Sequence, residues 1–180
     1  MHSSVSVSVA RPSTPDYFYD YWKLGYGISY IQSRQTVETI GWMAIGEARW
    51  FALDQDRLFQ RYNIDAGSTT MTGGSAVAIS ASASVTYRVP DYAGTVPYLF
   101  AGFGLSFSDI FGSTITYPFS TSERGMQSGL GCIFPLGMYI ETKYRGTTDI
   151  VILAKYDYGI PISGQSLSGN ASIGIGVRLD

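Results

Sequence analysis

The feature that most constrains this chain is an alternation of apolar and small residues that recurs along most of its 180 positions. Val5, Val7 and Val9 alternate with serines, and the stretch 77–87 places apolar residues at every second position, mostly with serine between them. A period of two residues is typical of a β-strand whose two faces lie in different environments. The pattern predicts an all-β fold.

About eight such segments are predicted, most of them near the 9–11 residues that a tilted transmembrane strand requires. They cover residues 4–9, 22–30, 39–53, 74–88, 99–108, 125–134, 138–145 and 167–179. Short connections (33–38, 90–96 and 135–137) alternate with long ones (11–21, 54–73, 110–123 and 146–166). This rhythm predicts one domain, residues 1–180, folded as a closed up-and-down antiparallel barrel with both termini at the short-turn end.

The composition distinguishes a membrane barrel from a soluble one. Charged residues make up only 14% of the chain, against about 25% in typical globular proteins. A soluble barrel or sandwich, the alternative, needs polar and charged side chains on its outer face. Here the second face of each strand is mostly glycine and serine, which suits the crowded lumen of a narrow barrel whose apolar face contacts lipid. We expect a transmembrane β-barrel with membrane lipids around it.

Two tryptophans support this orientation. Trp42 and Trp50 share the predicted lipid face of one strand. Eight residues of a strand tilted by about 40° span roughly 20 Å along the membrane normal, close to the separation of two interfacial aromatic girdles. We interpret both as interfacial aromatics, with ordinary packed tryptophans as the alternative.

Five stretches carry a resemblance to a known family. They are 41–50 (GWMAIGEARW), 96–105 (VPYLFAGFGL), 128–131 (SGLG), 138–145 (MYIETKYR) and 171–178 (ASIGIGVR). In this order they resemble the third, fifth, sixth, seventh and eighth strands of the opacity-protein-like, OmpA-type eight-stranded outer-membrane β-barrels. The resemblance is a pattern covering most of the chain from about Lys23. It implies the fold and a bacterial outer-membrane location, and little about activity. Members usually end on an aromatic residue, whereas this chain ends on Asp180.

The residues that carry most enzyme chemistry are scarce. His2 is the single histidine and lies at the N-terminus, so a Ser-His-acid triad or a histidine-rich metal site is not expected. Cys132, the single cysteine, is interpreted as a small strand residue. A net charge of -2 without basic clusters predicts no nucleic-acid partner. We predict no enzyme activity, cofactor or metal.

The N-terminus lacks a basic and apolar leader, so we interpret the chain as mature or as a fragment.

A charged set lies on the predicted lumen face. Its members are Glu47, Arg49, Arg88, Glu141, Lys143, Arg145 and Arg178. Eight strands leave room for side chains but not for an aqueous channel, so we predict a buried network that plugs the lumen. A proton or ion path is the alternative.

Two segments suggest contact with a partner. One is the aromatic run Asp16–Trp22, which alternatively forms an interfacial girdle, and the other is the apolar run Ile150–Leu153 in a predicted outer loop. The candidate contact residues are Tyr17, Phe18, Tyr19, Trp22, Ile150, Val151, Ile152 and Leu153. We expect them to form one surface patch that contacts another outer-membrane or surface protein. The segment 56–62 is predicted to be a short amphipathic turn.

These features favour a non-enzymatic outer-membrane barrel with a structural, adhesive or complex-subunit role through its outer loops. A narrow pore or transporter is the second hypothesis. A lipid-modifying enzyme is the third, which the lack of a suitably placed histidine disfavours.

Overall fold

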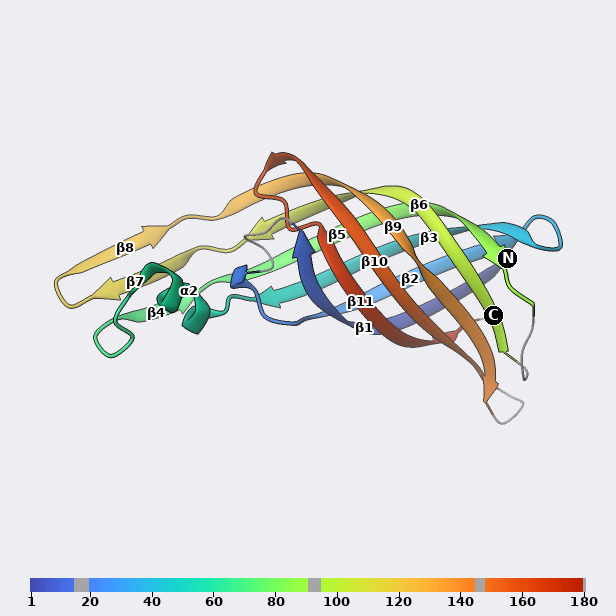
Figure 1. The fold of residues 1–180 in the computed structure, drawn as a ribbon, viewed down its shortest axis with the longest axis horizontal. Coiled ribbons are helices and arrows are strands. Elements are labelled where there is room, and N and C mark those ends of the chain that lie inside the picture. Colours follow the sequence, from blue (N-terminus) through green and yellow to red (C-terminus); the bar gives the residue numbers. More distant parts are fainter. Residues whose placement is uncertain (15–19, 91–94, 145–147, 180) are drawn as a thin grey trace.

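The computed structural model describes residues 1–14, 20–90, 95–144 and 148–179. Eight of its strands form a closed antiparallel barrel, in the order β1-β11-β10-β9-β6-β5-β3-β2 (Figure 1). The barrel strands are β1 (His2–Thr14), β2 (Gly25–Gln35), β3 (Ile40–Ala52), β5 (Ser75–Arg88), β6 (Thr95–Ile110), β9 (Gln127–Tyr144), β10 (Thr148–Gly164) and β11 (Gly169–Arg178). The predicted up-and-down barrel is confirmed.

The alternating residues of the sequence lie on the two opposite faces of the barrel wall, one toward the lumen and one toward the outside. On β1, Ser4 and Ser6 are buried in the lumen while Val7 is 61% exposed on the outside. The outward positions of the other strands are likewise apolar and exposed, as at Ile28, Phe103 and others along the barrel. An exposed apolar surface of this extent is typical of a barrel embedded in lipid. No helix of the described residues is long and apolar enough to cross a membrane.

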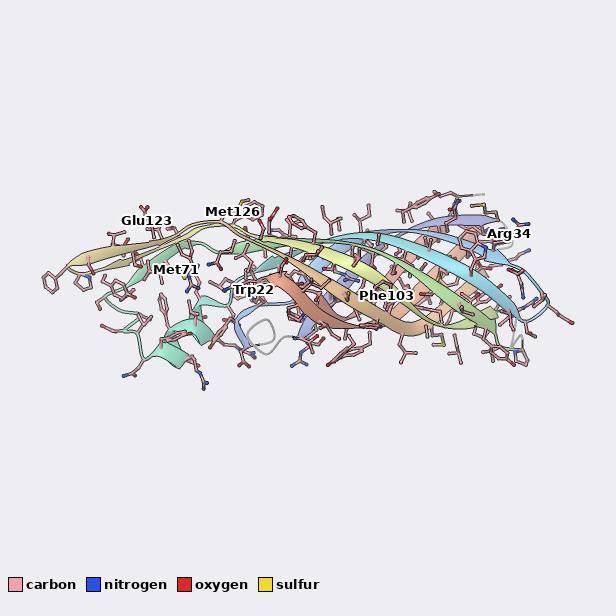
Figure 2. The ribbon with its side chains drawn as sticks, turned by 90° about the horizontal axis from the view of Figure 1, so that it is seen from above. Trp22, Arg34, Met71, Phe103, Glu123 and Met126 are labelled. Atoms are coloured by element: carbon pink, nitrogen blue, oxygen red, sulfur yellow. The ribbon has the colours of Figure 1, made fainter. Side chains whose placement is uncertain are left out.

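Both termini lie at the end of the barrel where the connections are short (Figure 1). The first and last strands pair along the length of the barrel and close it, with Val5 opposite Val177 and Val9 opposite Ile173. Figure 2 places Arg34 at the short-turn end, and Trp22 and Met71 toward the end that carries long connections. We call the latter the loop end.

The sixth and seventh predicted strands are one continuous strand, β9, so the turn predicted at 135–137 is wrong. Pro135 has a fully buried side chain and pairs with Asp157 of β10. On its other side the ladder to β6 passes from Ala101–Leu136 to Gly104–Ile133, skipping the proline. A proline without an N–H is tolerated where the ladder is interrupted.

The long loop predicted at 146–166 is also wrong, because β10 occupies Thr148–Gly164. Val151 and Leu153 point into the lumen and are buried, while Ile150 and Ile152 lie on the outer face. A strand that faces lipid on one side and an apolar core on the other is apolar at every position, so its alternation disappears.

The loop end carries structure of its own. Helix α2 (Gln55–Tyr62) covers the segment predicted as an amphipathic turn; Asp54 caps its N-terminus by accepting from Arg57 N at 3.3 Å. A second sheet has the order β4-β7-β8. Its strands are β4 (Thr70–Gly73), β7 (Ser113–Tyr117) and β8 (Ser120–Arg124). The β7–β8 hairpin extends well beyond the barrel, with α2 beside it (Figure 1).

Candidate functional site

Four charged side chains meet in the lumen. Glu47 and Arg49 come from β3, and Lys155 and Asp157 come from β10; each is at most 5% exposed. β3 and β10 are four places apart in the ring of eight, so these residues reach the centre from opposite walls. Because residues two apart share one face of a strand, each strand presents its two charges together.

The four charges form a closed set of ion pairs. Arg49 Nη2 lies 2.5 Å from Glu47 Oε2, and Arg49 Nη1 lies 3.2 Å from Asp157 Oδ2. Lys155 Nζ lies 2.9 Å from Asp157 Oδ2 and also pairs with Glu47 Oε2. Ser29 donates to Glu47 Oε1 at 2.9 Å. Two cations balance two carboxylates, so the cluster is neutral and links opposite walls of the barrel.

Apolar layers lie on both sides of these charges. On β3, Met43 and Ile45 precede the charged pair and Phe51 follows it. The layer toward the short-turn end consists of Ile31, Met43, Ile45, Phe100, Tyr139, Val151 and Leu153. The layer toward the loop end consists of Ala10, Trp22, Phe51, Ala76, Ala78 and Leu167. The lumen is therefore filled by apolar, charged and apolar layers in turn.

The structure separates the other predicted lumen charges from this cluster. Arg178 pairs with Asp149, with 3.3 Å between Nη1 and Oδ2, and contacts His2 at the short-turn end. Arg88 and Glu141 are half-buried and Lys143 is exposed. Arg145 lies outside the described residues.

Sequence reasoning missed Lys155 and Asp157 because it placed them in a loop. A usable signal was present: Leu153, Lys155 and Asp157 repeat the two-residue spacing of Ile45, Glu47 and Arg49. In both strands an apolar lumen position is followed by two charged ones.

The predicted contact patch is not assembled. Tyr17, Phe18 and Tyr19 lie outside the described residues. Trp22 is 7% exposed and forms a β-bridge with Leu53 at the loop end. Ile150, Val151, Ile152 and Leu153 belong to the short-turn half of β10, at the other end of the barrel. The hypothesis of one shared patch is therefore wrong. Trp42 and Trp50 lie on the outer face toward opposite ends of β3, 37% and 45% exposed.

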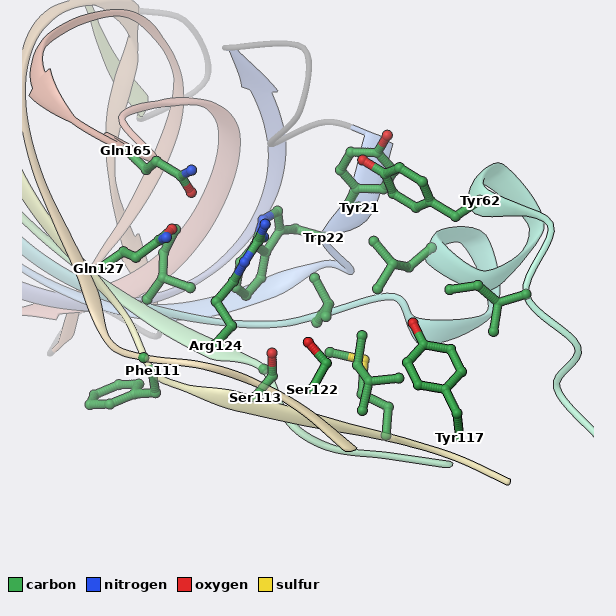
Figure 3. A pocket seen from close by; sticks show the side chains of 18 residues that line it. Tyr21, Trp22, Tyr62, Phe111, Ser113, Tyr117, Ser122, Arg124, Gln127 and Gln165 are labelled. Atoms are coloured by element: carbon green, nitrogen blue, oxygen red, sulfur yellow. The ribbon is translucent and has the colours of Figure 1, made fainter. Parts of the chain in front are cut away.

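The loop end contains a cavity of about 620 Å³ between α2 and the β4–β7–β8 sheet (Figure 3). The sheet is amphipathic with a period of two. Met71, Ile115 and Tyr117 face the cavity together with Ser113, and Ser122 and Arg124 continue this face on β8. The intervening residues, mostly threonine with Glu123, do not line it.

The other walls come from the helix and the barrel rim. Leu58 and Tyr62 of α2, with Ile64 after it, lie opposite the sheet, and Trp22 and Leu53 line the barrel side. The rings of Tyr21 and Tyr62 stack with centroids 6.2 Å apart. A hydrogen bond with Tyr62 raises the pKa of Tyr21 above its ordinary value.

Polar groups lie together at the barrel side of the cavity. Figure 3 shows the side chain of Arg124 extending toward Trp22, with Gln127 and Gln165 beside the barrel mouth. The lining contains no aspartate, glutamate, histidine or cysteine among the described residues. The walls are thus apolar and aromatic, with one cation and a few neutral hydrogen-bonding groups.

No family model matches the chain, and no curated protein matches it in sequence. Solved structures do match. Ail, the attachment invasion locus protein of Yersinia pestis, is 15% identical over 99% of this chain and 98% of its own, with a TM-score of 0.50. Neisserial surface protein A (NspA) is 13% identical over 99% and 95%, with a TM-score of 0.53. A major outer membrane protein from Thermus thermophilus is 9% identical over 98% and 99%, with a TM-score of 0.53. The chain has the fold of the eight-stranded outer-membrane β-barrels of the OmpA and opacity type.

This fold and the apolar outer face place the chain in a bacterial outer membrane. In an outer-membrane barrel the short turns face the periplasm and the long connections face outward. The cavity of this barrel therefore opens outside the membrane. Within the described ranges, no three histidine, cysteine, aspartate or glutamate side chains come together as a set of metal ligands.

Proposed function

We propose that this outer-membrane barrel is a non-enzymatic protein that contacts a partner outside the cell through its loop end, in an adhesive, structural or complex-subunit role. The observation that carries the proposal is the cavity of about 620 Å³. Its walls include a capped helix and a three-stranded sheet, and rigid elements position binding groups better than loops do.

Two further observations support a contact role. The β7–β8 hairpin ends in Phe119, which is fully exposed. A large aromatic side chain at an extended tip suits contact with a partner. The lumen, by contrast, is filled by alternating apolar and charged layers, which argues against the pore hypothesis.

The proposal is tested by trimming the hairpin. Cells displaying the parent, or a variant with residues 113–124 replaced by a short Gly-Ser turn, are compared for binding to glycan arrays, to immobilised proteins and to one another. The trimmed variant is expected to reach the membrane in equal amount, to retain heat-modifiable migration on gels, and to lose binding. Equal binding by both proteins contradicts the proposal.

A further inference from the structure

Two apolar faces at the loop end point toward one another without meeting. Leu58 and Ile64 come from the helix side, and Met71 and Ile115 come from the sheet side; all four are half-buried. Amphipathic elements usually close on each other, because interiors pack without voids much larger than a water molecule. A gap of about 620 Å³ is in the range of about 300–1,000 Å³ that is typical of ligand pockets.

The polarity of the cavity changes along its length. Arg124, Gln127 and Gln165 lie toward the barrel mouth (Figure 3), whereas Met71, Ile115 and Tyr117 lie on the sheet farther from the barrel. Arg124 is the one charged residue among the described lining residues. Its charge is complementary to an anion, and a guanidinium binds carboxylate, sulfate or phosphate through paired N–H donors.

We propose that this cavity binds a single-chain anionic amphiphile, taken up from the aqueous phase outside the cell. The anionic head lies at Arg124, and the alkyl chain lies between α2 and the β4–β7–β8 sheet. This inference rests on the proposed function, because it names the ligand of the same surface. The volume suits one alkyl chain with its head group. Access from the aqueous side is supported by Tyr62 and Arg124, which line the cavity and are exposed.

The test uses Trp22 as the reporter, because it lines the cavity and is buried. Trp42→Phe and Trp50→Phe remove the other two tryptophans, both on the outer face of β3. The full chain in lipid nanodiscs is titrated with octanoate below its micellar concentration, and empty nanodiscs are subtracted. We expect a saturable change in Trp22 emission. Octyltrimethylammonium and octanol should bind about tenfold or more weakly, which is the effect of losing one charged hydrogen bond.

Matched variants separate the head site from the chain site. Arg124→Gln is expected to weaken octanoate binding about tenfold while leaving octanol binding unchanged. Ile115→Glu places a carboxylate in the apolar wall and should abolish binding of both. Arg57→Gln is the control, because Arg57 is an exposed cation on α2 outside the lining. Heat-modifiable migration shows that each variant is folded.

Three results overturn the inference: no saturable signal in the parent, equal affinity for the cationic amphiphile, or an Arg124→Gln variant that binds octanoate like the parent. The two proposals fail separately. If hairpin trimming abolishes partner contact but the parent does not bind octanoate, the loop end is a contact surface and the proposed amphiphile ligand is wrong. If the parent binds octanoate while trimming leaves partner contact unchanged, the contact proposal fails and the ligand site stands.

Discussion

At the scale of single residues, the lumen shows how a narrow barrel accommodates charge. Burial of an ion costs free energy unless it is paired, and here each carboxylate contacts both cations. Small residues make this possible. A Cβ added to Gly27 would lie 2.8 Å from Arg49 Cγ, so a larger side chain there would displace this cation.

Because the cluster pairs two cations with two carboxylates, removing one charge should destabilise the barrel more than removing one charge of each sign. Lys155→Met leaves two carboxylates facing Arg49 alone and should lower the free energy of unfolding by about 3–5 kcal/mol. The double variant Glu47→Gln/Lys155→Met keeps the neutral Arg49–Asp157 pair and should be more stable than the single variant. Urea unfolding of the barrel in lipid, followed by tryptophan emission, measures both. A double variant no more stable than Lys155→Met would contradict the prediction.

Gly131 provides a second prediction at this scale. Gly131→Val is expected to prevent the barrel from closing, because its side chain collides with Ser166 and Ser168 in the lumen. Gly46→Val is the matched control, because no atom beyond its two chain neighbours lies within 4 Å of the position of its Cβ. Refolding yield, read from heat-modifiable migration, separates them. Equal yields would mean that the lumen expands to accept the extra volume.

At the scale of elements, the sequence predicts the strands whose two faces differ. β1 and β5 carry serine inward and apolar residues outward, and their alternation is visible. β10 has apolar residues on both faces at 150–153, so its first half resembles an exposed loop patch until its neighbours are known. Pro135 suggests a turn when only the sequence is known. The interruption in the β6–β9 ladder that accommodates it depends on pairing between distant residues, which the sequence pattern does not show. The four-charge cluster is not predicted as a whole for the same reason: it joins two strands more than a hundred residues apart.

The placement of β10 predicts the effect of a charge on its outer face. Ile152→Lys should destabilise the folded barrel by about 2 kcal/mol, because a lysine against lipid costs about 2–4 kcal/mol at the midplane and about 0–1 kcal/mol near the interface. Phe119→Lys makes a similar change at a fully exposed hairpin tip and should have no effect on barrel stability. Urea unfolding in lipid measures both. An unaffected Ile152→Lys barrel would contradict a lipid-facing position.

At the scale of the whole molecule, the barrel and its loop end differ in construction. The barrel buries charge between two apolar layers and presents apolar residues to lipid. The loop end presents threonines on one face of its sheet and keeps an apolar cavity on the other. The filled part thus lies within the membrane, and the part that extends beyond the membrane carries the open space.

A filled lumen predicts that the parent barrel does not conduct ions. An ion would have to pass the layer containing Met43, Phe100 and Leu153, where it would lose its hydration without gaining polar partners. An ion would also have to pass the charged layer, where the carboxylates and cations already pair across the lumen. Planar-bilayer recordings should show no discrete steps for the parent, nor for Glu47→Gln/Lys155→Met, since the apolar layers persist in that variant. Steps in the parent would restore the pore hypothesis. Steps in the variant alone would show that the charge cluster, rather than the apolar layers, closes the lumen.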